Sequence, residues 1–245
     1  NKEKLNDFTR SILYERYEER KKGITREDIM DYLVTEKDPR TNTNFTEEEI
    51  LNDIADLLGA GHETTSNTVC FALYFLSWNL DVQQTLQEEC DKFPALSFED
   101  VGRLTYTQAV IKESLRLQPP IEGFFRQTES EMEYKGIVVP EKSVFHFSIT
   151  EFGHDPNYFP NPEKFDPSRW LKNAENSSNE AWLAFGSGAR SCVGNRMGMM
   201  ESKLILCKIM QKFSVRRTSD APLEVEVALT SRPRGGLKLQ FFPRL

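Results

Sequence analysis

The sequence predicts a mainly α-helical protein with small β-sheets. Amphipathic segments with the helical period occupy most of the first 117 residues. From Glu131 onward the pattern changes to short apolar runs separated by turn residues, which is typical of strands. A third observation is a helical pattern over 196–213 that directly follows a glycine-rich loop containing Cys192.

The first elements are expected to be two helices. Apolar residues recur at helical spacing over residues 5–17, and Thr25 and Asp28 are suited to start a second helix before Ile29. Residues 38–44 are polar and are expected to form a loop.

A long helix is predicted next. Thr46 and Glu49 form a capping-box pattern at its start, and the helical pattern runs to about Asn79. Because the segment is apolar on most sides after Val69, we expect a buried central helix.

Two more helices and several strands complete the prediction. The helices cover 82–93 and 106–117, and Pro119-Pro120 stops the second one. The predicted strands are 132–134, 137–139, 144–147 and a final pair formed by 223–229 and 237–242.

Composition excludes several classes of protein. Of the 245 residues, 38% are hydrophobic and 28% charged, as in a globular chain with a sizeable core, and the net charge of -7 argues against nucleic acid as a partner. The 4 cysteines lack CxxC spacing, which argues against a disulfide framework or structural zinc. No apolar run is long enough to span a membrane, and no signal-peptide pattern is present.

Cys192 is the strongest candidate for a metal-binding residue, because it lies in a glycine-rich loop just before a predicted helix. A sulfur near a helix start faces free backbone N–H groups and the positive end of the helix dipole, which favour the metal-binding thiolate. Gly186, Gly188 and Gly194 let the backbone turn tightly and approach a flat ligand, and Arg190 supplies a permanent cation for its carboxylates. This set predicts a cysteine-ligated haem. The alternative is a buried structural cysteine.

The spacing Phe-x-x-Gly-x-Arg-x-Cys-x-Gly over 185–194 resembles the haem-binding signature of the cytochrome P450 family. The resemblance implies the C-terminal portion of the P450 fold, with a long central helix, helices around the haem and a cysteine-ligand loop. It also implies haem b (iron protoporphyrin IX) as the cofactor, with Cys192 as the iron ligand. The implied haem contacts are Phe185, Gly188, Arg190, Cys192, Gly194 and Arg126, the last as a second propionate partner or, alternatively, a solvated arginine.

The chain begins Asn1-Lys2-Glu3 within a helical pattern, and P450 proteins are typically about twice as long. We therefore expect residues 1–245 to be the C-terminal haem-binding part of a single P450 domain whose N-terminal half is absent. Membrane association through that missing part, at the cytosolic face of the endoplasmic reticulum, is a further expectation from the resemblance.

The middle of the long helix contains Ala60, Gly61, His62, Glu63 and Thr64. Glycine in a helix costs roughly 1 kcal/mol relative to alanine, so its presence indicates packing of a flat ligand against the helix. The resemblance makes Ala60 and Gly61 cofactor contacts, and makes Glu63 and Thr64 the acid–alcohol pair that assists proton delivery. A kinked helix with a solvated glutamate is the alternative. His62 is expected to be a packing or surface residue.

Glu113 and Arg116 lie three residues apart on one helix face. Alone they would be an ordinary surface pair. Together with Arg169 in the segment 165–170, they resemble a buried ion network behind the haem, with a structural role. The sequence Gly153-His154 departs from the His-Arg found in many members, which puts the contact of that histidine in doubt.

The segment after the proline pair is expected to line the substrate cavity through Ile121, Glu122 and Phe124. Glu122 either points away from the haem or recognises a polar substrate group. Residues 98–116 look most like animal sterol 24-hydroxylases, which indicates a sterol or other lipid as substrate.

The resemblance implies a monooxygenase that inserts one oxygen atom from O2 into a C–H bond, with electrons from NADPH-cytochrome P450 reductase. The face of this chain that binds the reductase is expected at Arg196, Lys203, Lys208 and Lys212. The alternative is that these residues form only a solvated stripe. A haem-thiolate isomerase or dehydratase, a non-catalytic fragment and a helical scaffold without cofactor are the alternatives.

Overall fold

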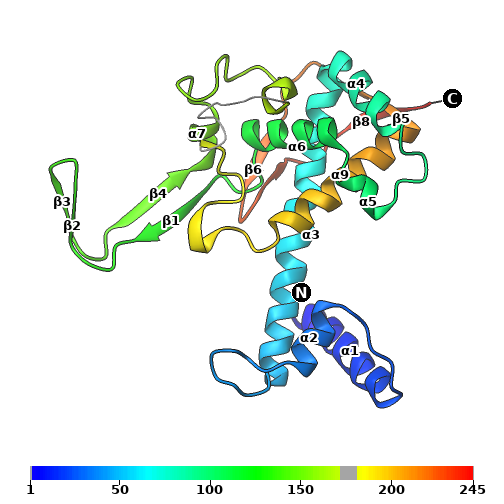
Figure 1. Cartoon of the computed structure of the whole chain (residues 1–245). Helices are drawn as coiled ribbons and strands as arrows, with labels where there is room; N and C mark the ends of the chain where they lie inside the picture. Colours follow the sequence, from blue (N-terminus) through cyan, green and yellow to red (C-terminus); the bar gives the residue numbers. More distant parts are fainter. Residues whose placement is uncertain (1, 172–180, 245) are drawn as a thin grey trace. The chain divides into compact units, whose positions relative to one another are not determined.

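The computed structural model describes residues 2–171 and 181–244. It separates into two compact units, Asn1–His62 and Glu63–Leu245 (Figure 1). The long helix α3, Glu47–Trp78, contributes residues to both units.

The first unit contains α1 (Lys2–Lys21), α2 (Ile29–Thr35) and the first half of α3. The predicted start of α2 is confirmed, because the Asp28 side chain accepts a hydrogen bond from the backbone N–H of Asp31. The capping box of α3 is confirmed as well: the Glu49 N–H donates to the Thr46 hydroxyl at 3.3 Å, and the Thr46 N–H donates to the Glu49 carboxylate at 2.8 Å. A small core holds these helices together, formed by Leu13, Met30, Leu33 and Ile50.

The second unit is built on four packed helices. The second half of α3 shares one apolar core with α4 (Leu80–Cys90), α6 (Thr105–Leu117) and α9 (Asn195–Lys212). Phe71, Ala72 and Leu76 are fully buried, as expected for a central helix. The short helices are α5 (Phe98–Val101), α7 (Ile149–Gly153), η1 (Pro167–Trp170) and η2 (Gly188–Arg190).

The strands of the described residues form antiparallel pairs. β1 (Gly123–Gln127) pairs with β4 (Val144–Ser148), and β2 (Met132–Tyr134) pairs with β3 (Ile137–Val139). Figure 1 shows these two pairs running outward from α7. Near the C-terminus, β5 (Phe213–Arg217) pairs with β8 (Leu239–Pro243), and β6 (Val225–Val227) pairs with β7 (Ser231–Pro233).

The predicted final strand pair is therefore wrong. The segment 225–227 pairs with 231–233, because the chain folds back through a turn in which the Ala228 N–H donates to the Thr230 carbonyl. The last strand, β8, instead pairs with β5, which directly follows α9. The Gln83 side chain holds β5 by hydrogen bonds to both the N–H and the carbonyl of Val215. Both partner strands were missed because they are short and carry arginines.

The fold class is confirmed as mainly α with small sheets. Within residues 2–171 and 181–244, no helix combines the length and apolar character needed to cross a membrane.

Candidate functional site

The loop before α9 is closed by its own backbone. The Cys192 N–H donates to the Phe185 carbonyl at 2.8 Å, and the Ser191 N–H donates to the Gly188 carbonyl at 3.0 Å. Gly186 and Gly188 have φ values of 70° and 72°, in the left-handed region that favours glycine. The spacing of the glycines therefore sets the shape of the loop.

The closed loop presents the sulfur outward. Cys192 is a free, exposed cysteine, and the neighbouring Val193 is 92% exposed. A Cβ added to Gly194 would lie 3.9 Å from the sulfur, so a glycine here keeps one side of Sγ open. The predicted alternative of a buried structural cysteine is wrong, since burial is what that role requires.

The surroundings of Cys192 fit a haem. Arg190 is exposed, and among the described residues no hydrogen bond or ion pair involves its guanidinium, which leaves it available for a propionate. The described part of the chain contains no group of three or more His, Cys, Asp and Glu side chains that could hold a metal ion. An exposed cysteine sulfur could serve as the one protein ligand of a metal that brings its other ligands with it, as in a porphyrin.

Gly198 brings the loop, α9 and α3 together. A Cβ built on it would lie 3.7 Å from the Thr65 hydroxyl of α3 and 4.0 Å from the Phe185 ring of the loop. Thr65 is buried, and it directly follows Glu63 and Thr64 in the sequence. The cysteine loop therefore lies close to the predicted acid–alcohol segment.

Glu63 is half-buried and firmly held. Its Oε1 accepts a hydrogen bond of 2.7 Å from the Thr230 hydroxyl and lies 3.8 Å from Nη1 of Arg232. The Glu63 side chain is 38% exposed, so it is partly solvated as well as hydrogen-bonded, and its predicted role in proton delivery remains a prediction. Thr64 beside it is half-buried, and its carbonyl accepts from the Thr68 hydroxyl.

Ala60, Gly61 and His62 belong to the first unit, where all three are exposed on α3. A Cβ added to Gly61 would meet no atom within 4 Å. The predicted cofactor contacts of Ala60 and Gly61 remain predictions.

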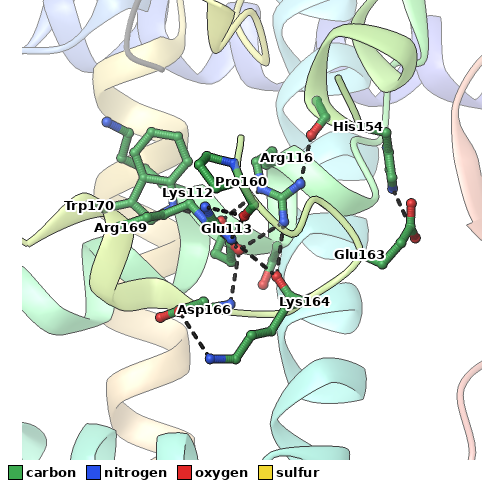
Figure 2. A network of polar contacts seen from close by, with 12 residues as sticks. Lys112, Glu113, Arg116, His154, Pro160, Glu163, Lys164, Asp166, Arg169 and Trp170 are labelled. Carbon is green, nitrogen blue, oxygen red and sulfur yellow. Dashed lines mark hydrogen bonds and ion pairs between the residues drawn. The ribbon is translucent and has the colours of Figure 1, made fainter. Parts of the chain in front are cut away.

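The structure brings Glu113, Arg116 and Arg169 together in one buried network (Figure 2). Arg116 donates to both carboxylate oxygens of Glu113 at 2.8 and 2.9 Å, and Arg169 donates to the same carboxylate at 2.9 Å. The Trp170 indole and the Asp166 N–H each add a bond of 2.9 Å. The Glu113 and Arg116 side chains are 0% exposed, so this is not a surface pair.

Gly153 explains how the network reaches α7. Nη1 of Arg116 donates to the Gly153 carbonyl at 2.6 Å, and a Cβ at Gly153 would lie 2.3 Å from the Arg116 carbonyl oxygen. Any other residue would force the two segments apart. The His154 ring contacts the Thr150 carbonyl at 2.9 Å and lies 3.9 Å from Glu163, on the side away from Glu113 (Figure 2).

The predicted substrate segment is half-buried at Ile121, Glu122 and Phe124. Glu122 accepts a hydrogen bond of 2.8 Å from the Ser231 hydroxyl, so its carboxylate is engaged by the protein. The Phe124 ring stacks on Phe147 at 5.2 Å.

Arg126 lies on β1, one residue after Phe125. Its guanidinium packs over the Phe124 ring at 4.6 Å and donates to the Phe125 carbonyl at 2.8 Å. The residue is half-buried rather than fully solvated, and its predicted propionate contact remains a prediction.

The predicted basic face on α9 is wrong at Lys203. This lysine is 4% exposed and donates to Gln108 on α6 at 3.3 Å, and burial lowers its pKa. The prediction grouped it with Arg196 and Lys212, which are exposed, and with Lys208, which is half-buried. A lysine inside the helix packing cannot present charge to a partner.

The sequence analysis missed residues that pack behind the cysteine loop and do not themselves line the candidate site. Trp182 packs its edge against Phe185 at 5.8 Å, and the Lys112 ammonium lies over the Trp170 and Trp182 rings at 4.3 and 4.8 Å. The only sequence signal was the density of tryptophan around the two motifs. For Thr230, no signal was available, because hydroxyl residues are ordinary in turns.

A mainly helical fold that carries an exposed cysteine on a glycine-containing loop at the start of a helix has the features that a haem-thiolate protein requires. The family model named Cytochrome P450 matches residues 1–241. The chain belongs to the cytochrome P450 family.

Individual relatives agree. Cyclooctat-9-en-7-ol 5-monooxygenase of Streptomyces melanosporofaciens is 33% identical over 219 residues, which cover 87% of this chain and 48% of that protein. Thromboxane-A synthase of Mus musculus is 33% identical over 212 residues, covering 83% and 40%. The crystal structure of the cytochrome P450 CYP102L1 matches with a TM-score of 0.89 and 26% identity, covering 100% of this chain and 56% of that one. The chain thus spans about half the length of these relatives.

Proposed function

We propose that the protein is the haem-binding part of a monooxygenase that inserts one oxygen atom from O2 into a C–H bond of a hydrophobic substrate. The observation that carries the proposal is the exposed Cys192 thiol on a loop closed by the Phe185–Cys192 hydrogen bond. The relative from Streptomyces melanosporofaciens, whose match covers 87% of this chain, is named as a monooxygenase.

In this proposal haem b is held by Cys192 as thiolate, with Arg190 and Arg126 as partners of the two propionates. Phe185, Gly188 and Gly194 border the ring. When bound, the haem supplies the activation of dioxygen. The loop's own hydrogen bonds hold the backbone that carries Cys192 in place, which reduces the entropy lost on binding.

Glu63 and Thr64 serve proton delivery. A carboxylate that accepts a charge-assisted hydrogen bond from Thr230 is held in one orientation, and the adjacent Thr64 hydroxyl provides a donor and an acceptor on the same helix turn. The buried Glu113 network is structural: it fixes α6 to the segment 164–170.

The proposed electron donor is NADPH-cytochrome P450 reductase, with Arg196 and Lys212 as exposed cations for its docking. The proposed substrate is a sterol or other lipid, and the proposed location is the cytosolic face of the endoplasmic reticulum membrane. Phe124 and Phe147 offer stacked aromatic surface to an apolar substrate. Because the chain spans half of its relatives, we expect weak or no turnover without the remaining segments.

A thiolate test decides the central point. Replacing Cys192 by Ser should abolish the thiolate-type absorption spectrum of the reduced carbon monoxide complex, because a neutral hydroxyl does not replace a thiolate as an iron ligand. Cys70→Ser, at a half-buried cysteine on α3, is the matched control and should leave the spectrum unchanged. An unchanged spectrum in Cys192→Ser would contradict the proposal.

An isomerase that rearranges a peroxide without using O2 is the second candidate, since one relative is named as a synthase and not as a monooxygenase. Thr64→Ala separates the two. A monooxygenase should release more hydrogen peroxide per NADPH consumed, because proton delivery is impaired. An isomerase should keep its turnover.

A further inference from the structure

The turn between β6 and β7 places two consecutive hydroxyl groups on two carboxylates. The Thr230 hydroxyl donates to Glu63 on α3 at 2.7 Å, and the Ser231 hydroxyl donates to Glu122 in the predicted substrate segment at 2.8 Å. These are the two acidic side chains that the sequence singled out for the site. We infer that Thr230 is a positioning residue for the Glu63 carboxylate. The inference rests on the proposed role of Glu63 in proton delivery.

The direction of the Thr230 hydroxyl is set by a second residue of α3. Nδ2 of Asn67 lies 3.5 Å from the Thr230 oxygen and is the donor, since an amide nitrogen cannot accept. The Thr230 proton is then left for Glu63. Asn67 lies one helical turn after Glu63, so both side chains that contact Thr230 lie on the same face of α3. Asn67 and Thr230 are 7% and 4% exposed, so the donor side of the contact is shielded from water, whereas the Glu63 side chain is 38% exposed.

The position of the threonine itself is fixed by its neighbour. Ser231 is fully buried, its N–H donates to the Pro120 carbonyl at 2.7 Å, and its hydroxyl holds Glu122. Ser231 therefore anchors the turn at two points beside Thr230. A preorganised donor loses little entropy when it orients the carboxylate.

Arg232 adds charge without taking over the contact. Its Nη1 lies 3.8 Å from Glu63, whereas its Nε donates to Glu226 at 2.6 Å, and its side chain is half-exposed. An exposed ion pair at this distance contributes little. The shorter, part-buried hydrogen bond from the Thr230 hydroxyl is what decides the orientation of Glu63.

The first test uses the ligand-free protein and needs no activity. The carboxyl carbon resonance of Glu63, assigned through Glu63→Gln, should shift in Thr230→Val, which removes the hydroxyl at similar volume. Thr230→Ser keeps the hydroxyl and should restore the wild-type position. Thr218→Val is the matched control, because the Thr218 hydroxyl donates to the Lys238 carbonyl, away from Glu63. An unmoved Glu63 resonance in Thr230→Val would overturn the inference.

The second test reads proton delivery in a haem-loaded protein that also contains the remaining segments, with NADPH and the flavoprotein reductase as electron source. Loss of one charge-assisted hydrogen bond should raise the ratio of hydrogen peroxide to water formed by about tenfold in Thr230→Val, with rescue in Thr230→Ser. A normal ratio in Thr230→Val beside a raised ratio in Glu63→Gln overturns the positioning role alone. A normal ratio in Glu63→Gln overturns the proposed proton role of Glu63, and with it the inference. If Thr230→Val does not fold, Thr230→Ala and Asn67→Asp are read in the same two assays, and wild-type behaviour of both counts against the inference.

Discussion

Gly198 on α9 faces Thr65 on α3 so closely that an added Cβ would be 3.7 Å from the threonine hydroxyl. The same point is 4.0 Å from the Phe185 ring, which belongs to the cysteine loop. Gly198 therefore lies where the cysteine loop and the helix that carries Glu63 and Thr64 come together, with room for a side chain no larger than a methyl group.

We expect Gly198→Ala to be tolerated. Its Cβ would make ordinary van der Waals contacts, and alanine favours a helix by about 1 kcal/mol over glycine. The melting temperature should stay the same or rise. Gly198→Leu should instead push Thr65 and Phe185 away and lower the amount of haem bound per chain, measured by absorbance after reconstitution. Equal haem loading in the two variants would show that the close approach is unimportant.

The buried carboxylate of Glu113 should be essential for stability. Glu113→Gln leaves the Arg116 and Arg169 guanidinium groups without a counter-charge, and breaking a buried ion pair costs about 3–5 kcal/mol. The free energy of unfolding in urea measures this loss. Glu99→Gln, at an exposed glutamate on α5, is the control. A urea midpoint in Glu113→Gln equal to that of the control would refute the structural role.

The first unit should lose stability in acid through Asp28. The hydrogen bond from Arg16 lowers the pKa of Asp28 from 3.8 to about 2, so the folded state favours the charged carboxylate. That stability is present above the unfolded pKa and is lost as the pH falls from about 4 to about 2. Asp28→Asn keeps an N-cap side chain but removes the charge, and should flatten the melting temperature over this range. The exposed neighbour Glu27→Gln is the control; if both variants retain the wild-type acid profile, the Arg16 contact is not responsible.

Lys203 should also make stability rise with pH, but in the alkaline range. Burial lowers its pKa below the usual 10.5, so the unfolded chain binds the proton more tightly than the folded one. Stability should therefore rise as the pH increases through the lowered pKa toward the unfolded value. Lys203→Met should remove this rise and increase stability at neutral pH, whereas the exposed Lys212→Met should do neither. Thermal unfolding at several alkaline pH values measures both effects, and a rise that persists in Lys203→Met would count against the buried lysine.

The sequence by itself determined the features that depend on neighbours along the chain. The capping pair Thr46 and Glu49, the Asp28 cap and the glycine-dependent turn before Cys192 all appear in the structure as the local pattern predicted. Such features are decided within one or two turns of backbone, where residue type and spacing control the hydrogen bonds.

Only the tertiary structure decided which distant groups meet. The strand 225–227 has its own hairpin partner, Lys203 is covered by α6, and Thr230 reaches Glu63 from 167 residues away. Strand partners, burial of a helix face and long-range hydrogen bonds depend on how whole elements pack, and that packing leaves no periodic signal in a short polar segment.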